Sequence, residues 1–178
     1  PNTVHTDLLE GRLPYIDELW RDRWDVDSSK TISPTDVTDR ALWAWVRRDE
    51  LGFDRLVVHY MQPHAPFRSL GGPGGWGPRT KGFPSIWNAL RDNEISRETV
   101  IEAYSDNLEW VLEEVERWQA DTSADLLVTS DHGNAMGELG EWGHPNKSGN
   151  PVVRRVPLAT LSGSGESIDM ESVETPGN

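Results

Sequence analysis

Two short runs of β-forming residues, separated by a long amphipathic helix, constrain the fold of this chain most strongly. Residues 55–61 read RLVVHYM and residues 125–130 read DLLVTS, and both runs are typical of buried strands. Between them, residues 97–120 place apolar side chains such as Val100 and Val111 at helical spacing. This order predicts a right-handed βαβ unit with parallel strands. We therefore expect an α/β fold with a mainly parallel sheet flanked by helices.

The rest of the chain extends this α/β pattern. Ser33 precedes Pro34 and an acidic first turn, which favours a helix from there to about residue 50. Further elements are expected as two short helices and a strand, at residues 15–24, 84–92 and 156–161. The 178 residues suffice for one domain, which we place at residues 1–161. Residues 162–178 are rich in Ser, Gly and Glu, which favours a disordered tail.

The charge of the chain excludes several classes of partner. The 30 Asp and Glu residues outnumber the 17 Lys and Arg residues, and the formal net charge is −13. This balance argues against nucleic-acid binding, because a phosphate backbone demands a basic face. No apolar run approaches the ~20 residues that span a bilayer, so we expect no membrane segment and a cytoplasmic protein. The dense carboxylate surface with few lysines favours a halophilic origin over an ordinary acidic protein.

Chemically active side chains follow both predicted strands at the point where each one ends. His64 comes three residues after the first strand, and Asp131 and His132 come directly after the second. Ligands bind beyond the carboxyl ends of parallel strands, so we expect these side chains to lie along one rim of the sheet. A third loop brings four more polar residues behind them, namely Glu138, Glu141, His144 and Lys147.

Asp131 and His132 together form a candidate metal site. Carboxylate and imidazole groups bind Zn²⁺, Mn²⁺ and related divalent ions. Both side chains can reach one ion if the backbone turns sharply behind them, and Gly133 permits such a turn. A capped turn, in which Asp131 accepts backbone N–H groups, explains the same residues without a metal. Taken alone, the Asp-His-Gly triplet leaves both interpretations open.

Four short motifs occur in a fixed order along the chain. Residues 59–67 read HYMQPHAPF, 127–133 read LVTSDHG, 137–145 read GELGEWGHP and 155–158 read RVPL. This succession resembles the sulfatase-like branch of the alkaline phosphatase superfamily, over roughly residues 55–161. The resemblance implies an alkaline-phosphatase/sulfatase-like α/β fold and a metal-dependent hydrolase of small-molecule sulfate or phosphate esters.

The resemblance also implies a role for each candidate residue. Asp131 and His132 would be metal ligands, for Ca²⁺ or Mg²⁺ as in sulfatases or for Mn²⁺ or Zn²⁺ as in phosphatase relatives. His64 would contact the sulfate or phosphate group, or a second metal where there is one. Many sulfatases have a Lys after the Trp-Gly pair, whereas this chain has His144 there and Lys147 three residues further on. Either His144 would be a further metal or substrate ligand, as in phosphatase-like members, or Lys147 would take the role of that Lys. Whichever of the two residues fills this place would stabilise charge on the non-bridging oxygens of the ester.

Two departures from the family pattern leave the substrate and the reaction open. Gln62 stands where many relatives have Asp, so sulfate and phosphate esters both remain candidates. Nothing before residue 55 resembles the family's nucleophile segment, so we expect this chain to be the C-terminal half of the fold, without its N-terminal part. One hypothesis is therefore half of a hydrolase site. The other is a non-catalytic binding module, which would associate with itself or another chain through an exposed sheet edge.

Overall fold

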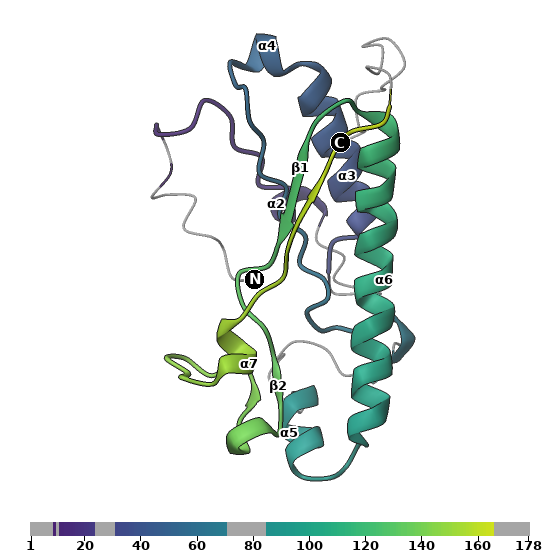
Figure 1. Cartoon of the computed structure of the whole chain (residues 1–178), viewed down its shortest axis with the longest axis vertical. Coiled ribbons are helices and arrows are strands. Elements are labelled where there is room, and N and C mark those ends of the chain that lie inside the picture. Colours follow the sequence, from purple (N-terminus) through teal and green to yellow (C-terminus); the bar gives the residue numbers. More distant parts are fainter. Residues whose placement is uncertain (1–8, 10, 24–30, 71–84, 166–178) are drawn as a thin grey trace.

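The long helix α6 (Arg97–Asp121) runs along one side of the molecule and contacts α3, α5 and η1 (Figure 1). The computed structural model describes residues 9, 11–23, 31–70 and 85–165. Ser96 caps α6, because its hydroxyl accepts a hydrogen bond from the Thr99 N–H at 3.1 Å. The helix predicted over residues 97–120 is therefore confirmed.

A second helix, α3 (Pro34–Val46), packs against the C-terminal half of α6. The rings of Trp45 and Trp118 meet edge to face, with their centroids 6.2 Å apart. At the start of α3, the Thr35 hydroxyl donates a hydrogen bond to the buried Glu114 carboxylate at 2.6 Å. The two helices are thus joined by aromatic packing and by a satisfied buried carboxylate.

The start and the end of the predicted helix at residues 34–50 follow from local signals. The Ser33 hydroxyl accepts the Thr35 N–H at 3.2 Å, and Gly52 ends the short helix α4 (Arg48–Leu51) with a φ of 76°. The predicted region therefore contains two successive helices, α3 and α4. The remaining helices are short: α2 (Trp20–Arg23), η1 (Arg68–Leu70), α5 (Ile86–Arg91), η2 (Glu138–Gly140) and α7 (Pro151–Arg154).

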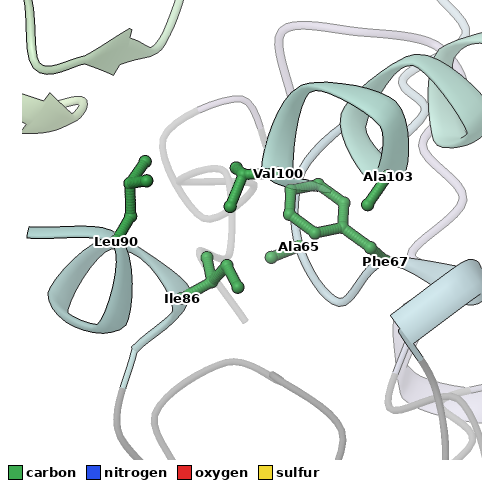
Figure 2. Packing of buried hydrophobic residues seen from close by; sticks show 6 residues of the cluster. All are labelled: Ala65, Phe67, Ile86, Leu90, Val100 and Ala103. Carbon is green, nitrogen blue, oxygen red and sulfur yellow. The ribbon is translucent and has the colours of Figure 1, made fainter. Parts of the chain in front are cut away.

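A hydrophobic core cluster lies between the N-terminal half of α6, helix α5 and the segment before η1. Figure 2 shows Phe67 pointing among small and branched side chains of these elements, and Phe67 is only 2% exposed. Its ring lies edge to face against Trp87 and Tyr104, at centroid distances of 6.4 and 6.2 Å. The cluster consists of Ala65, Phe67, Ile86, Leu90, Val100 and Ala103.

The strands of the described residues form two separate ribbons of two strands each. Strand β1 (Leu126–Thr129) pairs with β4 (Leu158–Leu161), and Leu126 lies opposite Leu161. Strand β2 (Ala135–Met136) pairs with β3 (Trp142–Gly143). Both pairings are antiparallel. The strands predicted at 125–130 and 156–161 are confirmed with shorter bounds.

The prediction of a mainly parallel sheet flanked by helices, in the manner of alkaline phosphatases and sulfatases, is wrong. The structure is a small mixed α/β arrangement whose described strands form only the two antiparallel ribbons. The chain that leaves β1 folds into β2, β3 and α7 and then returns alongside β1, as Figure 1 shows. The partner of β1 is therefore β4, which runs in the opposite direction after β2, β3 and α7, and not residues 55–61.

Residues 55–61 are extended but join no ladder with another described segment. Side chains alternate along them: Tyr60 lies inward, with its hydroxyl 2.8 Å from the Thr38 hydroxyl of α3, whereas Val57 is 91% exposed. A strand buried on both faces does not expose every second side chain. The prediction that this apolar run forms a buried strand of a parallel sheet is therefore wrong.

Two further predictions concern the membrane and the tail. No helix within the described ranges is long and apolar enough to cross a bilayer. Residues 162–165, at the start of the predicted tail, lie against the end of α6, where the Ser164 N–H donates to the Gln119 carbonyl at 2.9 Å. The rest of that tail, 166–178, lies outside the described residues. The single domain over 1–161 stays a prediction.

Candidate functional site

His64 lies in the segment that leads from the extended residues 55–61 to η1. Its N–H donates to the Met61 carbonyl at 3.0 Å, and its carbonyl accepts from Asn107 Nδ2 at 3.2 Å. The ring Nδ1 faces the Ala65 carbonyl. Because a carbonyl oxygen only accepts, we assign the proton of the neutral ring to Nδ1. Nε2 then carries a lone pair that can accept a hydrogen bond or bind a metal.

Asp131 and His132 follow directly after β1. The Asp131 side chain is 74% exposed, and its Oδ1 accepts the His132 N–H at 2.9 Å, a contact of the kind that the capped turn predicts. The other carboxylate oxygen lies 3.6 Å from His132 Nε2. His132 Nδ1 faces the Gly133 carbonyl at 3.0 Å, so its Nε2 also carries a lone pair when the ring is neutral. The capped turn and a ligand pair are therefore compatible in one geometry.

His144 follows β3 and is held against helix α5 by the residue before it. Gly143 has a φ of 70°, and a Cβ at this position would lie 2.9 Å from the Trp87 ring. Both the left-handed backbone and the close approach favour glycine here. The chain therefore passes directly over Trp87 before it presents the half-buried His144.

The three imidazoles meet although they come from three separate segments. The His144 ring lies 4.2 Å from the His132 ring and 5.5 Å from the His64 ring, between centroids. His144 Nε2 is 3.4 Å from His64 Nε2. We call His64, Asp131, His132 and His144 the histidine cluster.

The pairing of β2 with β3 explains why His132 and His144 meet. Ala135 lies opposite Gly143 in this antiparallel ribbon, so the residues just before β2 and just after β3 leave at the same end. From the sequence, His64, Asp131 and His132 are expected along one rim of a parallel sheet. In the structure His144 contacts both other rings: the short antiparallel ribbon brings it to His132, and His64 reaches it from the segment before η1.

The surroundings of His144 favour its neutral form. Burial lowers the pKa of His144, the positive forms of His132 and His64 lower it further, and Asp131 partly opposes this shift. Because the pKa of a free histidine is already about 6.5, His144 is neutral at pH 7. Near neutral pH the ring can therefore accept a proton or bind a ligand through a lone pair.

We expect an NMR titration of the chelator-treated protein to show His144 gaining its proton at a lower pH than a free histidine. The variant His132→Asn removes a positive neighbour, so the pKa of His144 should rise. His59→Asn provides the control, because His59 is an exposed residue of the extended segment 55–61, outside the cluster. A His144 pKa at or above the ordinary value in the unmodified protein would contradict the burial that the structure shows.

The donor atoms of the histidine cluster are of the kind that bind divalent ions, but they form no complete metal site. Two ligands about 2.1 Å from a tetrahedral ion lie about 3.4 Å apart. The His64–His144 nitrogen pair at 3.4 Å and the Asp131–His132 pair at 3.6 Å are close to this spacing. Among the described residues, however, no group of three or more His, Asp or Glu side chains is placed to hold one metal ion. The cluster thus offers two ligand pairs.

Lys147 lies outside these contacts. It is exposed, has a φ of 62°, and occupies the turn in which the Ser148 N–H donates to the Pro145 carbonyl at 3.2 Å. It has no hydrogen bond or ion pair with another residue of the described part. Its role as an alternative to His144 in binding the ester stays a prediction.

The two glutamates of the same loop stabilise the loop through hydrogen bonds and are not part of the histidine cluster. Glu138 accepts hydrogen bonds from the Met136 N–H at 2.6 Å and from Arg97 Nη2 at 3.0 Å. These contacts lower the pKa of Glu138 below its ordinary range. Glu141 accepts the Ser148 hydroxyl. Both carboxylates therefore stabilise the turn that connects β2, β3 and α7.

Sequence reasoning missed Asn107, which holds the segment that carries His64. Asn107 is fully buried on α6, on the apolar stripe that also contains Val100, Ala103 and Val111. A polar residue within an apolar helical stripe must find hydrogen-bond partners when it is buried. A polar residue in the middle of an apolar helical stripe is therefore the sequence signal that could have identified Asn107.

Comparison with known proteins adds no relative, since no family model, no curated protein and no solved structure matches this chain. The resemblance to sulfatase-like enzymes therefore depends on the motifs of the sequence alone.

Proposed function

We propose that this chain carries part of the active site of a metal-dependent hydrolase of sulfate or phosphate esters. The convergence of His64, Asp131, His132 and His144 from three separate segments carries this proposal. All four residues also lie within the motifs that resemble sulfatase-like enzymes. The β2–β3 ribbon brings His132 and His144 together without a parallel sheet, and His64 meets His144 from the segment before η1.

Asp131 and His132 would hold the divalent ion. The Gly133 carbonyl orients the His132 ring through Nδ1, which is how metal-binding histidines are commonly held. A site that contains imidazole favours Mn²⁺ or Zn²⁺ over Ca²⁺ or Mg²⁺, which prefer oxygen ligands. The bound ion would supply Lewis-acid polarisation of an ester oxygen. Further ligands would have to come from outside the described residues.

His64 and His144 suit the charged end of the ester. Their Nε2 atoms lie 3.4 Å apart, so one small oxyanion can reach both rings. A bound anion favours the protonated form of a nearby imidazole, so each ring would then donate an N–H to a non-bridging oxygen. Lys147 remains the alternative donor. The chain would thus bind the anion and stabilise the charge that develops on it.

The first test is thermal unfolding in molar salt, with chelator and then with Mn²⁺, Zn²⁺, Ca²⁺ or Mg²⁺ added. A metal at ~100 times its dissociation constant stabilises the folded state by about 2.7 kcal/mol. We expect Mn²⁺ or Zn²⁺ to raise the melting temperature by about 5–10 °C for a chain of this size. The variant Asp131→Ala should lose this shift. Asp125→Ala, which removes an exposed carboxylate just before β1, should keep it.

Hydrolysis of nitrophenyl sulfate and nitrophenyl phosphate by the full natural protein completes the test. We expect His132→Ala to abolish the metal-dependent rate. A full rate in this variant, or the same melting shift in Asp131→Ala as in the unmodified protein, would contradict the assigned metal ligands.

A non-catalytic binding module is the second candidate function, and two observations favour it. No Ser or Thr hydroxyl of the described residues is hydrogen-bonded to an imidazole of the cluster, as an activated nucleophile would be. The β1–β4 ribbon also exposes Leu127 and Leu158, by 65% and 69%. A metal-specific melting shift without hydrolysis, together with self-association at high salt, would favour this module. A monodisperse monomer would count against association through the ribbon.

A further inference from the structure

Asn107 is the most completely buried polar side chain near the histidine cluster. It lies in the middle of α6 with 0% of its surface exposed. All of its hydrogen bonds go to one segment, about 40 residues earlier in the chain. Asn107 Nδ2 donates to the carbonyls of His64 and Pro66, at 3.2 and 3.0 Å, and Oδ1 accepts the Arg68 N–H at 3.0 Å.

These three bonds use both donors and the acceptor of the carboxamide. An Asp at this position would place a carboxylate oxygen against two carbonyl oxygens, and an apolar residue would leave all three backbone groups without a partner. The side chain therefore matches the backbone of residues 64–68 in both hydrogen-bond direction and position.

The backbone fixed in this way is the one that orients the His64 ring. Asn107 holds the carbonyl of His64, while the ring Nδ1 faces the carbonyl of the next residue, Ala65. On the opposite side of the ring, Nε2 faces His144. We propose that Asn107 is a positioning residue, which acts through the backbone of residues 64–68 to keep His64 Nε2 facing His144 in the cluster. Its importance for catalysis rests on the proposed function.

Two other contacts anchor the same segment and allow the positioning effect to be separated from folding. Phe67 inserts into the hydrophobic cluster, and Arg68 forms two hydrogen bonds with Asp106 at 2.9 Å each. Removal of the Asn107 carboxamide leaves both anchors in place. We therefore expect the segment to stay on α6 while the backbone at His64 shifts.

The experiment compares the imidazole resonances of the unmodified protein with those of Asn107→Ala and the milder Asn107→Ser. The expected result is a shift of the His64 and His144 resonances and loss of the nuclear Overhauser contact between their rings, without change at His59. Thr38→Val is the matched control. It removes an equally buried hydrogen bond, to Tyr60, away from the cluster, so it should lower stability without altering these signals.

A measurement on the unmodified protein covers the case in which neither Asn107 variant folds. The side-chain amide protons of Asn107 should exchange with solvent far more slowly than those of the exposed Asn93. Equal exchange rates, or a folded Asn107→Ala with unchanged His64 and His144 signals, would overturn the positioning role. None of these readouts uses metal or ester, so failure of the proposed function would show separately, as absent metal shifts and absent hydrolysis.

Discussion

Replacement of Gly133 by alanine is expected to lower the free energy of unfolding by about 3 kcal/mol. A Cβ at this position would lie 2.2 Å from the Val152 carbonyl oxygen, far inside van der Waals contact. The obstacle is backbone, so no side-chain rotation can relieve it. The Gly133 N–H also donates to the Val153 carbonyl at 2.8 Å, and a shift of the loop would lengthen this bond.

The same substitution should disturb the histidine cluster, because Gly133 follows His132 and its carbonyl orients the His132 ring. Urea unfolding gives the stability, and the metal-dependent melting shift gives the state of the site. Gly149→Ala serves as the control, since a Cβ there meets no atom within 4 Å, and its stability should stay within about 0.5 kcal/mol. If Gly133→Ala were as stable as Gly149→Ala, the close packing of this loop on α7 would be wrong.

The helices could be predicted from the sequence because their signals are local. Ser33 and Ser96 each accept a backbone N–H of the first turn, and Gly52 ends α4 in a left-handed conformation. Each signal acts within a few residues of the helix end that it defines. The helices expected at residues 34–50 and 97–120 therefore lie within a few residues of the observed ones. Of the helix expected at 15–24, the described residues 15–23 contain only the four-residue helix α2.

The sheet could not be predicted, because strand pairing depends on contacts between distant residues. Residues 55–61 have the composition of a buried strand, yet Tyr60 contacts Thr38 of α3 and Val57 is exposed to solvent. The composition of a segment indicates a preference for an extended backbone, but it does not indicate which strand will pair with that segment. The partner of β1 is set by the compact path through β2, β3 and α7, which no local pattern in the sequence specifies.

For the candidate site too, local sequence patterns identified residues, whereas the contacts between distant residues could not be predicted. The sequence indicates His64, Asp131, His132 and His144 as chemically active residues; in the structure an antiparallel ribbon brings His132 and His144 together, and His64 meets His144 from the segment that packs on α6. Their catalytic and metal-binding roles stay predictions. The contribution of Asn107 depends on a segment about 40 residues away, so only the polar break in the apolar stripe of α6 could have pointed to it.

Replacement of Phe67 by alanine is expected to cost about 3–5 kcal/mol of unfolding free energy, the range found for large aromatic residues in protein cores. Phe67 is 2% exposed, and its ring contacts Trp87 of α5 and Tyr104 of α6 edge to face. The substitution would leave a cavity where α5, α6 and the His64 segment meet, and the relaxation of neighbouring side chains would fill only part of it.

The effect of Phe67→Ala should extend to the site, because Phe67 lies three residues after His64 and Trp87 lies beneath the Gly143 that precedes His144. Urea unfolding measures the stability, and the imidazole resonances measure the position of both rings. Phe67→Leu retains most of the buried volume and should cost less than half as much, whereas Leu127→Ala, at an exposed position, should cost about 0.5 kcal/mol or less. If Phe67→Ala were no more harmful than Leu127→Ala, Phe67 would not be the anchor of this core. If it lowered stability without moving either imidazole signal, Asn107 alone would be sufficient to hold His64 in place.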